Sequence, residues 1–317
     1  MRQLFRTTTA YRALSGSAAQ GEAAHFTLVL FPDAKYLRVY LAECAKAFFG
    51  AEEGTRTARL IDEESYADCL FYPAAGGKLT AEAAGAISDE SILRPVEGTK
   101  KLFVLDAFQS VTPLVQNKLL KLLEEPPAGV YFLAGATAEH TVLPTVLSRA
   151  NVRRVPPFSE REAAEALARM HPEAGDVRAA AAACGGVLSV GEDLLAGGGE
   201  DFRLAEQFLA GGDTAQVCRA AGERGKTFFA ALRLVLRDVL LYRTGQERFA
   251  VLSDPQLKQL AARYPAGAAI AAIGFVTDAE REIQFNANPA QAALALALRI
   301  GEERERSERC SSPGRGA

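Results

Sequence analysis

One stretch, residues 100–158, constrains the fold of this chain more than any other. It contains two short apolar runs, at 102–105 and 130–134, on either side of a segment with apolar residues at helical spacing. Short continuous apolar runs are typical of strands buried on both faces of a parallel sheet. The helix between them should begin at Thr112-Pro113 and end before the prolines at 126 and 127, because proline disfavours helical geometry in the preceding residue. The pattern therefore predicts a parallel α/β fold.

The first predicted strand, residues 26–31, leads into a segment that does not fit a phosphate-binding loop. Such a loop uses glycines to bring backbone N–H groups to the phosphates, a lysine to reach them and a Ser or Thr to hold Mg²⁺. Here the segment contains no glycine, Pro32 lacks an N–H, and Asp33 places negative charge where phosphates would lie. Lys35 is a candidate remnant of a phosphate contact, and the alternative is a solvated lysine at the start of a helix.

The most specific motif lies inside the central stretch. Residues 116–137 read QNKLLKLLEEPPAGVYFLAGAT, and LPTVLSR follows at 143–149. In this order the motifs resemble the AAA+ module of bacterial DNA polymerase III clamp-loader subunits, above all the delta-prime subunit. The resemblance is strong over 100–158, fair over 25–50 and 184–195, and weak elsewhere. An ordinary βαβ unit would explain the apolar residues but not Gln116, Asn117, the glutamate pair or Ser148-Arg149.

The resemblance implies a domain organisation that the residue patterns support. An AAA+-type α/β sheet domain is expected over 1–157, a small helical lid over 158–200 and an all-α collar that joins subunits over 201–303. Ser159 and Glu162 have the spacing of a capping box, which predicts the first lid helix. A monomeric helical bundle is the alternative for the collar. The charged tail rich in Gly, Pro and Ser, residues 304–317, is expected to be disordered.

Three further positions suggest that an ATPase site is damaged. By the resemblance, Asp106 takes the place of the metal-binding acidic residue, but the catalytic glutamate beside it is replaced by Ala107. Without that carboxylate no side chain there orients an attacking water. The polar sensor falls on Thr137, and the lid's sensor arginine falls near Glu192, which has the opposite charge. The chain is therefore predicted not to be an enzyme. A degenerate nucleotide site is expected at Lys35, Asp106 and Thr137.

The resemblance gives Ser148 and Arg149 a role in trans. Arg149 would act as an arginine finger on ATP bound to a neighbouring subunit, for which its planar guanidinium is suited. The other interpretation is a surface arginine that ends a helix and is favoured by the helix dipole. The implied partners are gamma/tau-type ATPase subunits, the delta subunit, the sliding clamp indirectly and primer-template DNA as part of the complex.

DNA contact is predicted on the helix that faces the central channel in relatives. Thr112 lies at its start, where a helix N-terminus can bind phosphate, and Lys118 and Lys121 lie further along it. A solvated basic face is the alternative. The net charge is −3, so any DNA contact must come from a local patch.

Cysteine usage and hydropathy limit the remaining possibilities. The five cysteines are dispersed without a CxxC pair, which favours a reduced cytoplasmic protein. Delta-prime relatives usually carry a four-cysteine zinc module, but residues 50–69 offer only Cys69 and no histidine, too few ligands for tetrahedral zinc. No metal or other cofactor is expected. No run of 18 apolar residues is present, so no membrane span is expected.

Two other functions remain open at this point. An ATP-hydrolysing clamp-loader or helicase-type AAA+ ATPase would need the phosphate loop and the acidic pair. A replication-independent AAA+-fold scaffold would keep the fold but would not co-purify with the polymerase III ATPase subunit. The prediction is a non-hydrolysing subunit that supports ATP-dependent loading of the sliding clamp.

Overall fold

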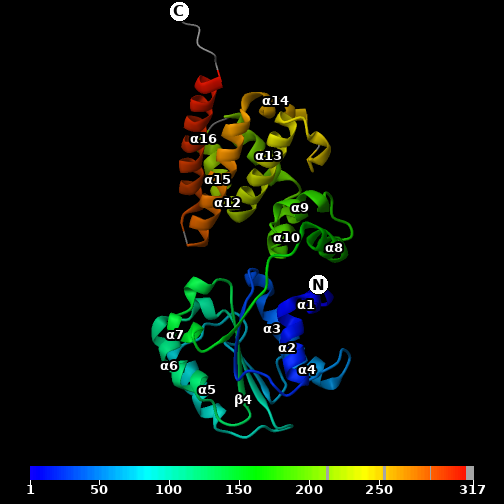
Figure 1. Ribbon diagram of the computed structural model, residues 1–317, viewed down its shortest axis with the longest axis vertical. Helices are drawn as coiled ribbons and strands as arrows, with labels where there is room; N and C mark the ends of the chain where they lie inside the picture. Colours follow the sequence, from blue (N-terminus) through cyan, green and yellow to red (C-terminus); the bar gives the residue numbers. More distant parts are fainter. Residues whose placement is uncertain (212–213, 253–254, 286, 312–317) are drawn as a thin grey trace, which may run out of the picture. The chain divides into compact units, whose positions relative to one another are not determined.

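The computed structural model of this protein describes residues 1–211, 214–252, 255–285 and 287–311. The chain divides into two compact units, Met1–Pro157 and Phe158–Ala317 (Figure 1). The division follows a proline pair, at which a regular helix cannot continue. The finer predicted division of the second unit into a lid at 158–200 and a collar at 201–303 stays a prediction.

Five parallel strands form the sheet of the first unit, in the order β2-β3-β4-β1-β5. The central strands are buried on both faces, as their continuous apolar sequences predict. The strands are β1 Phe26–Leu30, β2 Cys69–Tyr72, β3 Lys101–Leu105, β4 Val130–Ala136 and β5 Asn151–Arg154. This parallel α/β sheet, followed by a helical second unit, confirms the predicted AAA+-type fold class.

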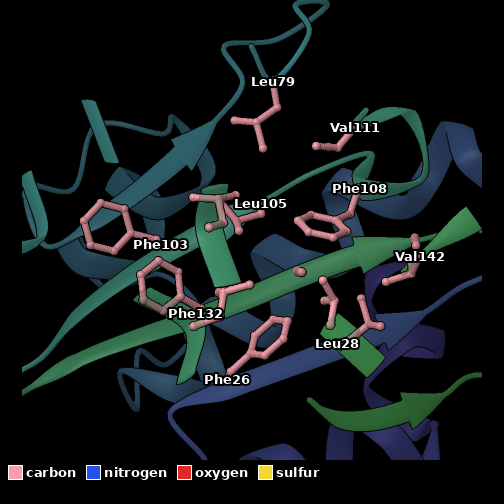
Figure 2. Packing of buried hydrophobic residues seen from close by; sticks show 14 of the residues in the cluster. Phe26, Leu28, Leu79, Phe103, Leu105, Phe108, Val111, Phe132 and Val142 are labelled. Carbon is pink, nitrogen blue, oxygen red and sulfur yellow. The ribbon is translucent and has the colours of Figure 1, made fainter. Parts of the chain in front are cut away.

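Helices cover both faces of this sheet (Figure 1). They are α1 Arg2–Thr7, α2 Thr9–Ala19, α3 Ala34–Phe48, α4 Arg56–Asp62, α5 Ala81–Ser91, α6 Pro113–Glu124 and α7 Pro144–Leu147, with the 3₁₀ turns η1 Phe108–Ser110 and η2 Glu139–Thr141. On the face covered by α5–α7, Phe26, Phe103 and Phe132 form an apolar core (Figure 2). Phe103 and Phe132 stack with ring centroids 5.2 Å apart.

On the opposite face α3 packs very closely against β4. A Cβ on Gly135 would lie 2.7 Å from a methyl carbon of Leu41 and 2.8 Å from one of Leu37. A larger residue there would force Leu37 or Leu41 to shift, so Gly135 contributes to the close packing of α3 on the sheet. Because all strands are parallel, the residues that follow β1, β3 and β4 lie at the same edge of the sheet, where open α/β sheets bind ligands.

The second unit is helical wherever the structure assigns regular secondary structure. Its helices are α8 Glu160–Met170, α9 Val177–Ala183, α10 Leu188–Ala196, α11 Glu200–Ala210, α12 Thr214–Arg224, α13 Lys226–Arg243, α14 Pro255–Arg263, α15 Ala266–Gln284 and α16 Pro289–Ser311, with the 3₁₀ turn η3 Glu247–Phe249. The predicted capping box is confirmed, since Ser159 accepts from the Glu162 N–H and the Glu162 carboxylate accepts from the Ser159 N–H. Within the described residues, no single helix is long and apolar enough to cross a membrane; only α14 and α15 together pass that test, with a bend of 104°.

The helix ends agree with the predictions except at the C-terminus. α6 begins at Pro113 as predicted, without a capping hydrogen bond from the Thr112 hydroxyl. The tail predicted to be disordered from Arg304 is helical to Ser311, because Tyr264 packs under Arg304 and ion pairs one turn apart, such as Arg309 with Glu305, stabilise the helix. Residues 312–317 lie outside the described residues.

The strand β5 was not predicted at all. Its sequence, Asn-Val-Arg-Arg, is too polar to resemble the buried strands, because β5 is an edge strand that pairs only with β1. It matters for the site because it follows directly on the turn that carries Arg149. The helix before it, α7, is short and ends at Leu147.

Candidate functional site

The segment between β1 and α3 is too short to wrap around phosphates. It consists of Phe31, Pro32 and Asp33, and α3 starts at the next residue. Asp33 is the N-cap, and its buried carboxylate accepts a hydrogen bond from the Lys35 N–H at 3.2 Å. The helix N-terminus that a phosphate would occupy in an active relative is thus satisfied by the chain's own carboxylate.

Aromatic side chains fill the space beneath this segment. Phe31 is 1% exposed and stacks on Tyr40 with ring centroids 4.8 Å apart. Phe5 of α1 packs edge-on against both rings. The Tyr40 hydroxyl lies 2.7 Å from the Thr8 hydroxyl, and burial raises the pKa of Tyr40. Lys35 points away from this cluster: it is exposed, and its ammonium lies 5.6 Å from the centre of the Tyr36 ring.

Asp106, at the end of β3, is bound by an arginine. Arg38 of α3 donates from Nη1 to the Asp106 carboxylate at 3.1 Å, from Nη2 to Glu64 at 2.6 Å, and from both nitrogens to the Pro73 carbonyl at 3.1 Å. Hydrogen bonding to Glu64 and Asp106 raises the pKa of Arg38 against the opposing effect of burial, so the guanidinium stays charged. A fixed cation therefore occupies the position next to Asp106 that a metal ion would need.

The other two positions of the predicted nucleotide site add little chemistry. Ala107 has φ 49°, a left-handed conformation that is uncommon outside glycine, and its N–H donates to the Asp106 carboxylate at 2.7 Å. Thr137 is half-buried at the end of β4, at the same sheet edge as Asp106. Taken together, the residues present do not fit Mg²⁺-ATP: the Asp33 carboxylate caps the start of α3, and Arg38 is paired with the Asp106 carboxylate.

The turn after α7 has a different character. Arg149 is partly exposed, with 33% of its side chain open to solvent, and its Nη1 donates to the Thr145 carbonyl at 2.9 Å. The Arg149 Nε is shielded from solvent and lies 3.0 Å from a carboxylate oxygen of Glu124, an ion pair without the alignment of a hydrogen bond. The Ser148 hydroxyl donates to the same Thr145 carbonyl at 3.1 Å, which stabilises the turn.

Gln116 explains how this turn is held on α6. Its side chain is 1% exposed, and its Nε2 donates to the carbonyls of Val111 and Thr141 at 2.9 and 3.2 Å. Its Oε1 accepts from the Leu143 N–H at 2.9 Å, directly before α7. A buried polar side chain with all of these bonds fixes two chain segments against one helix. Gln116 therefore has a structural role that the apolar pattern did not explain.

The three residues predicted to contact DNA lie along one helix. Lys118 and Lys121 are exposed on α6, and Lys118 donates to the Ala81 carbonyl of α5 at 2.8 Å. Thr112 is exposed at the N-terminus of α6. This arrangement is compatible with a phosphate contact, and DNA binding stays a prediction.

No metal centre is formed by the part of the chain that the structure describes. Among those residues, no group of three or more His, Cys, Asp or Glu side chains is placed to hold an ion. Cys44 and Cys69 are each 1% exposed, and burial raises the pKa of both thiols. Since the thiolate is the metal ligand, such thiols are poor donors. The predicted absence of zinc itself stays a prediction.

Three site residues were missed by the sequence analysis. Arg38 and Glu64 close the former metal position, and Glu124 contacts Arg149. The signal for Glu124 was present, since the glutamate pair was unexplained by an ordinary βαβ unit. Arg38 and Glu64 carried no such signal, because they are 26 residues apart and their contact depends on how α3 and the end of α4 approach the sheet edge.

The fold and the site together define a AAA+-type α/β module in which Asp106 is paired with Arg38 and the turn after α7 carries a partly exposed arginine. A family model described as "DNA polymerase III, delta subunit" matches residues 7–159, which span nearly all of the first unit. The predicted resemblance to the DNA polymerase III clamp-loader subunits is thereby confirmed for this unit.

Curated relatives agree with this family. The DNA polymerase III subunit gamma/tau of Mycobacterium tuberculosis (strain H37Rv) is 33% identical over 139 residues, which is 38% of this chain and 24% of that protein. The same protein of Mycobacterium bovis matches equally. The chain thus spans about a quarter of the length of these relatives.

Solved structures with similar folds have low sequence identity. A gamma subunit-related protein of Thermotoga maritima is 17% identical, with 92% of this chain and 99% of that chain covered and a TM-score of 0.44. The Bacillus subtilis clamp loader delta protein is 11% identical, with 93% and 100% covered and a TM-score of 0.35. The Thermotoga maritima RuvB branch migration motor is 13% identical, with 80% and 86% covered and a TM-score of 0.42.

Proposed function

We propose that this chain is a delta-prime-type subunit of a bacterial clamp loader that does not hydrolyse ATP and provides Arg149 to ATP bound on a neighbouring subunit. It would act in the cytoplasm beside gamma/tau-type ATPase subunits and a delta subunit, in a complex that places the sliding clamp on primer-template DNA. The clamp is contacted indirectly in this proposal.

The observation that carries the proposal is the ion pair between Arg38 and Asp106. An acidic residue at the end of β3 could serve Mg²⁺ only if its oxygens were open, and here a charged guanidinium from α3 occupies them. Phe31, in the short segment after β1, is buried and stacked on Tyr40, so this segment offers no open loop for phosphates. A chain that keeps the fold but closes its own site is best explained as a partner for a subunit whose site is open.

Arg149 supplies the other half of the argument. A fixed, charged and partly exposed guanidinium at the end of a short turn suits phosphate recognition in trans. An ATP-hydrolysing subunit is disfavoured by the closed site. A replication-independent scaffold remains the second candidate, and it differs by predicting no association with the polymerase III ATPase.

The decisive test uses the assembled complex. Complexes rebuilt with ATPase and delta subunits and with either the wild-type chain or Arg149→Ala are compared for clamp- and DNA-stimulated ATP turnover. An arginine finger contributes roughly 10³–10⁵ in rate at its own site. Total turnover should fall only in part, because this subunit serves one of several sites. Arg149→Lys should not restore the rate, since a point charge cannot reproduce the planar fork.

Two further measurements serve as controls for this test. The isolated chain should give no saturable micromolar binding of Mg²⁺-ATP by isothermal titration, and such binding would contradict the closed site. Pull-down with the ATPase subunit should recover both Arg149 variants as well as the wild type. If the Arg149→Ala complex loads clamps at the wild-type rate, Arg149 is a surface arginine and the proposed role in trans is wrong.

A further inference from the structure

We propose that Glu124 is a positioning residue for Arg149: its carboxylate restrains the guanidinium at Nε and leaves the donors of Nη2 for a phosphate. The inference rests on the proposed function and adds a residue to it. The motif that carries Glu124 was unexplained by the fold, since a helix that ends before two prolines does not need a carboxylate there.

The contacts of Arg149 are unevenly distributed over its guanidinium. A guanidinium has five N–H donors in a rigid plane. The Nε side faces Glu124 at 3.0 Å, and Nη1 donates to the Thr145 carbonyl at 2.9 Å and lies 3.4 Å from the Ser148 hydroxyl. Within the described part of the chain, Nη2 makes no hydrogen bond. The donors that remain available therefore lie on Nη2.

The support for this geometry comes from a rigid element. Glu124 is the last residue of α6, a helix whose Leu119 and Leu123 are fully buried against the sheet. The backbone of the segment before α7 is already fixed by Gln116, which lies on the same helix. Glu124 is thus free to act on the Arg149 side chain alone, and its removal should leave the turn in place.

The physical reason for a positioning effect is the loss of rotamer freedom. A free arginine side chain samples many rotamers, and each ordering step costs free energy when a phosphate arrives. An arginine held at Nε and Nη1 before the partner binds has already lost this freedom, so more of the phosphate interaction is available in the transition state. Since 52% of the Glu124 side chain is exposed, the contact is screened and its contribution should be modest.

The test is a double-mutant cycle in the assembled complex. Glu124→Ala should slow ATP turnover about two- to fivefold at the one site that this subunit serves, the range of a partly exposed ion pair. The kcat of total stimulated turnover should therefore fall, but by less than in Arg149→Ala, with little change in KM for ATP. Glu124→Gln should keep most of the rate, because its amide oxygen can take the same place beside Nε. The matched control is Glu125→Ala, the exposed neighbouring carboxylate, which should leave turnover unchanged.

The possible outcomes distinguish the positioning role of Glu124 from the arginine finger role of Arg149. In the Arg149→Ala background, Glu124→Ala should have no further effect, and an equal fall there would mean that Glu124 acts elsewhere. If Arg149→Ala lowers turnover but Glu124→Ala does not, or if Glu124→Ala raises it as release of a latch would, the positioning role is wrong while the arginine finger stands. No effect of Arg149→Ala would overturn both. Equal thermal unfolding midpoints for all variants exclude a folding defect.

Discussion

The segment after β1 and the turn after α7 belong to the same unit but have opposite character. The first is buried and internally satisfied: Phe31 stacks on Tyr40, and Asp33 caps its own helix. The second is partly exposed, and Nη2 of Arg149 makes no hydrogen bond within the described residues. In the proposed function, this difference corresponds to a nucleotide position lost to core packing and an arginine kept for a neighbouring subunit.

The comparison has an energetic consequence. Phe31, after β1, is buried and should contribute to stability as a core residue does, whereas Arg149 is partly exposed and is proposed to act on a neighbouring subunit. Substitutions after β1 should therefore lower the free energy of unfolding. Substitution of Arg149 should leave it nearly unchanged and should lower the ATP turnover of the assembled complex instead. The following expectations run from the largest change in the free energy of unfolding to the smallest.

The largest effect is expected for Phe31→Ala. Phe31 is 1% exposed and contacts the rings of Phe5 and Tyr40, so its removal leaves a cavity. Such truncations cost about 3–5 kcal/mol. Urea unfolding followed by circular dichroism measures the loss. A cost below about 1 kcal/mol would mean that the segment is not part of the core, and the contrast between the two regions would fail.

Arg38→Met should have an intermediate effect. It removes the cation between Asp106 and Glu64 and leaves two carboxylates near each other, at an expected cost of about 1–2 kcal/mol. Binding of Mg²⁺-ATP should still be absent by calorimetry, because the segment after β1 lacks glycines and offers no open loop for phosphates. Recovery of saturable binding in this variant would show that the ion pair alone closes the site.

Arg149→Ala should leave the free energy of unfolding within about 0.5 kcal/mol of the wild type, as is usual for a partly exposed side chain away from the core. The same urea titration measures it, with Phe31→Ala as the contrasting variant. A loss of more than about 2 kcal/mol would assign Arg149 a structural role in the turn and weaken the interpretation of its activity.

Acid should slightly lower the free energy of unfolding of the first unit. Asp62 of α4 accepts hydrogen bonds from Arg2 and Lys46, which connect α1 to the rest of the unit. Burial raises the pKa of Asp62, but the bonds from Arg2 and Lys46 outweigh burial and the net pKa is lowered. A lowered folded-state pKa means that the stabilisation is present above the unfolded value and is lost as the pH falls through the folded value.

The check for this effect is a comparison of wild type with Asp62→Asn between pH 7 and pH 3. The difference in unfolding free energy between the two proteins should shrink as the pH drops below about 4, the unfolded-state pKa of an aspartate. A difference that stays constant over this range would mean that Asp62 does not titrate with folding.

Much of the fold followed from local patterns. The apolar runs of β1, β3 and β4 predicted parallel strands, and the capping box predicted the start of α8, because periodicity and capping depend on residues a few positions apart. Strand β5 escaped prediction, since its polar sequence is explained only by its place at the sheet edge. The end of α16 escaped for a similar reason: charged residues one turn apart stabilise a helix that composition alone would call disordered.

For the candidate site too, some features followed from the sequence and others only from the tertiary structure. By itself, the sequence determined what is missing: glycines after β1, a carboxylate at position 107 and a cysteine module before Cys69. Only the tertiary structure decided what took their place. Arg38 meets Asp106 across 68 positions, and Glu124 meets Arg149 across 25. Such pairs are set by strand order and by how close each helix packs on the sheet, as Gly135 allows for α3, and no local pattern records these distances.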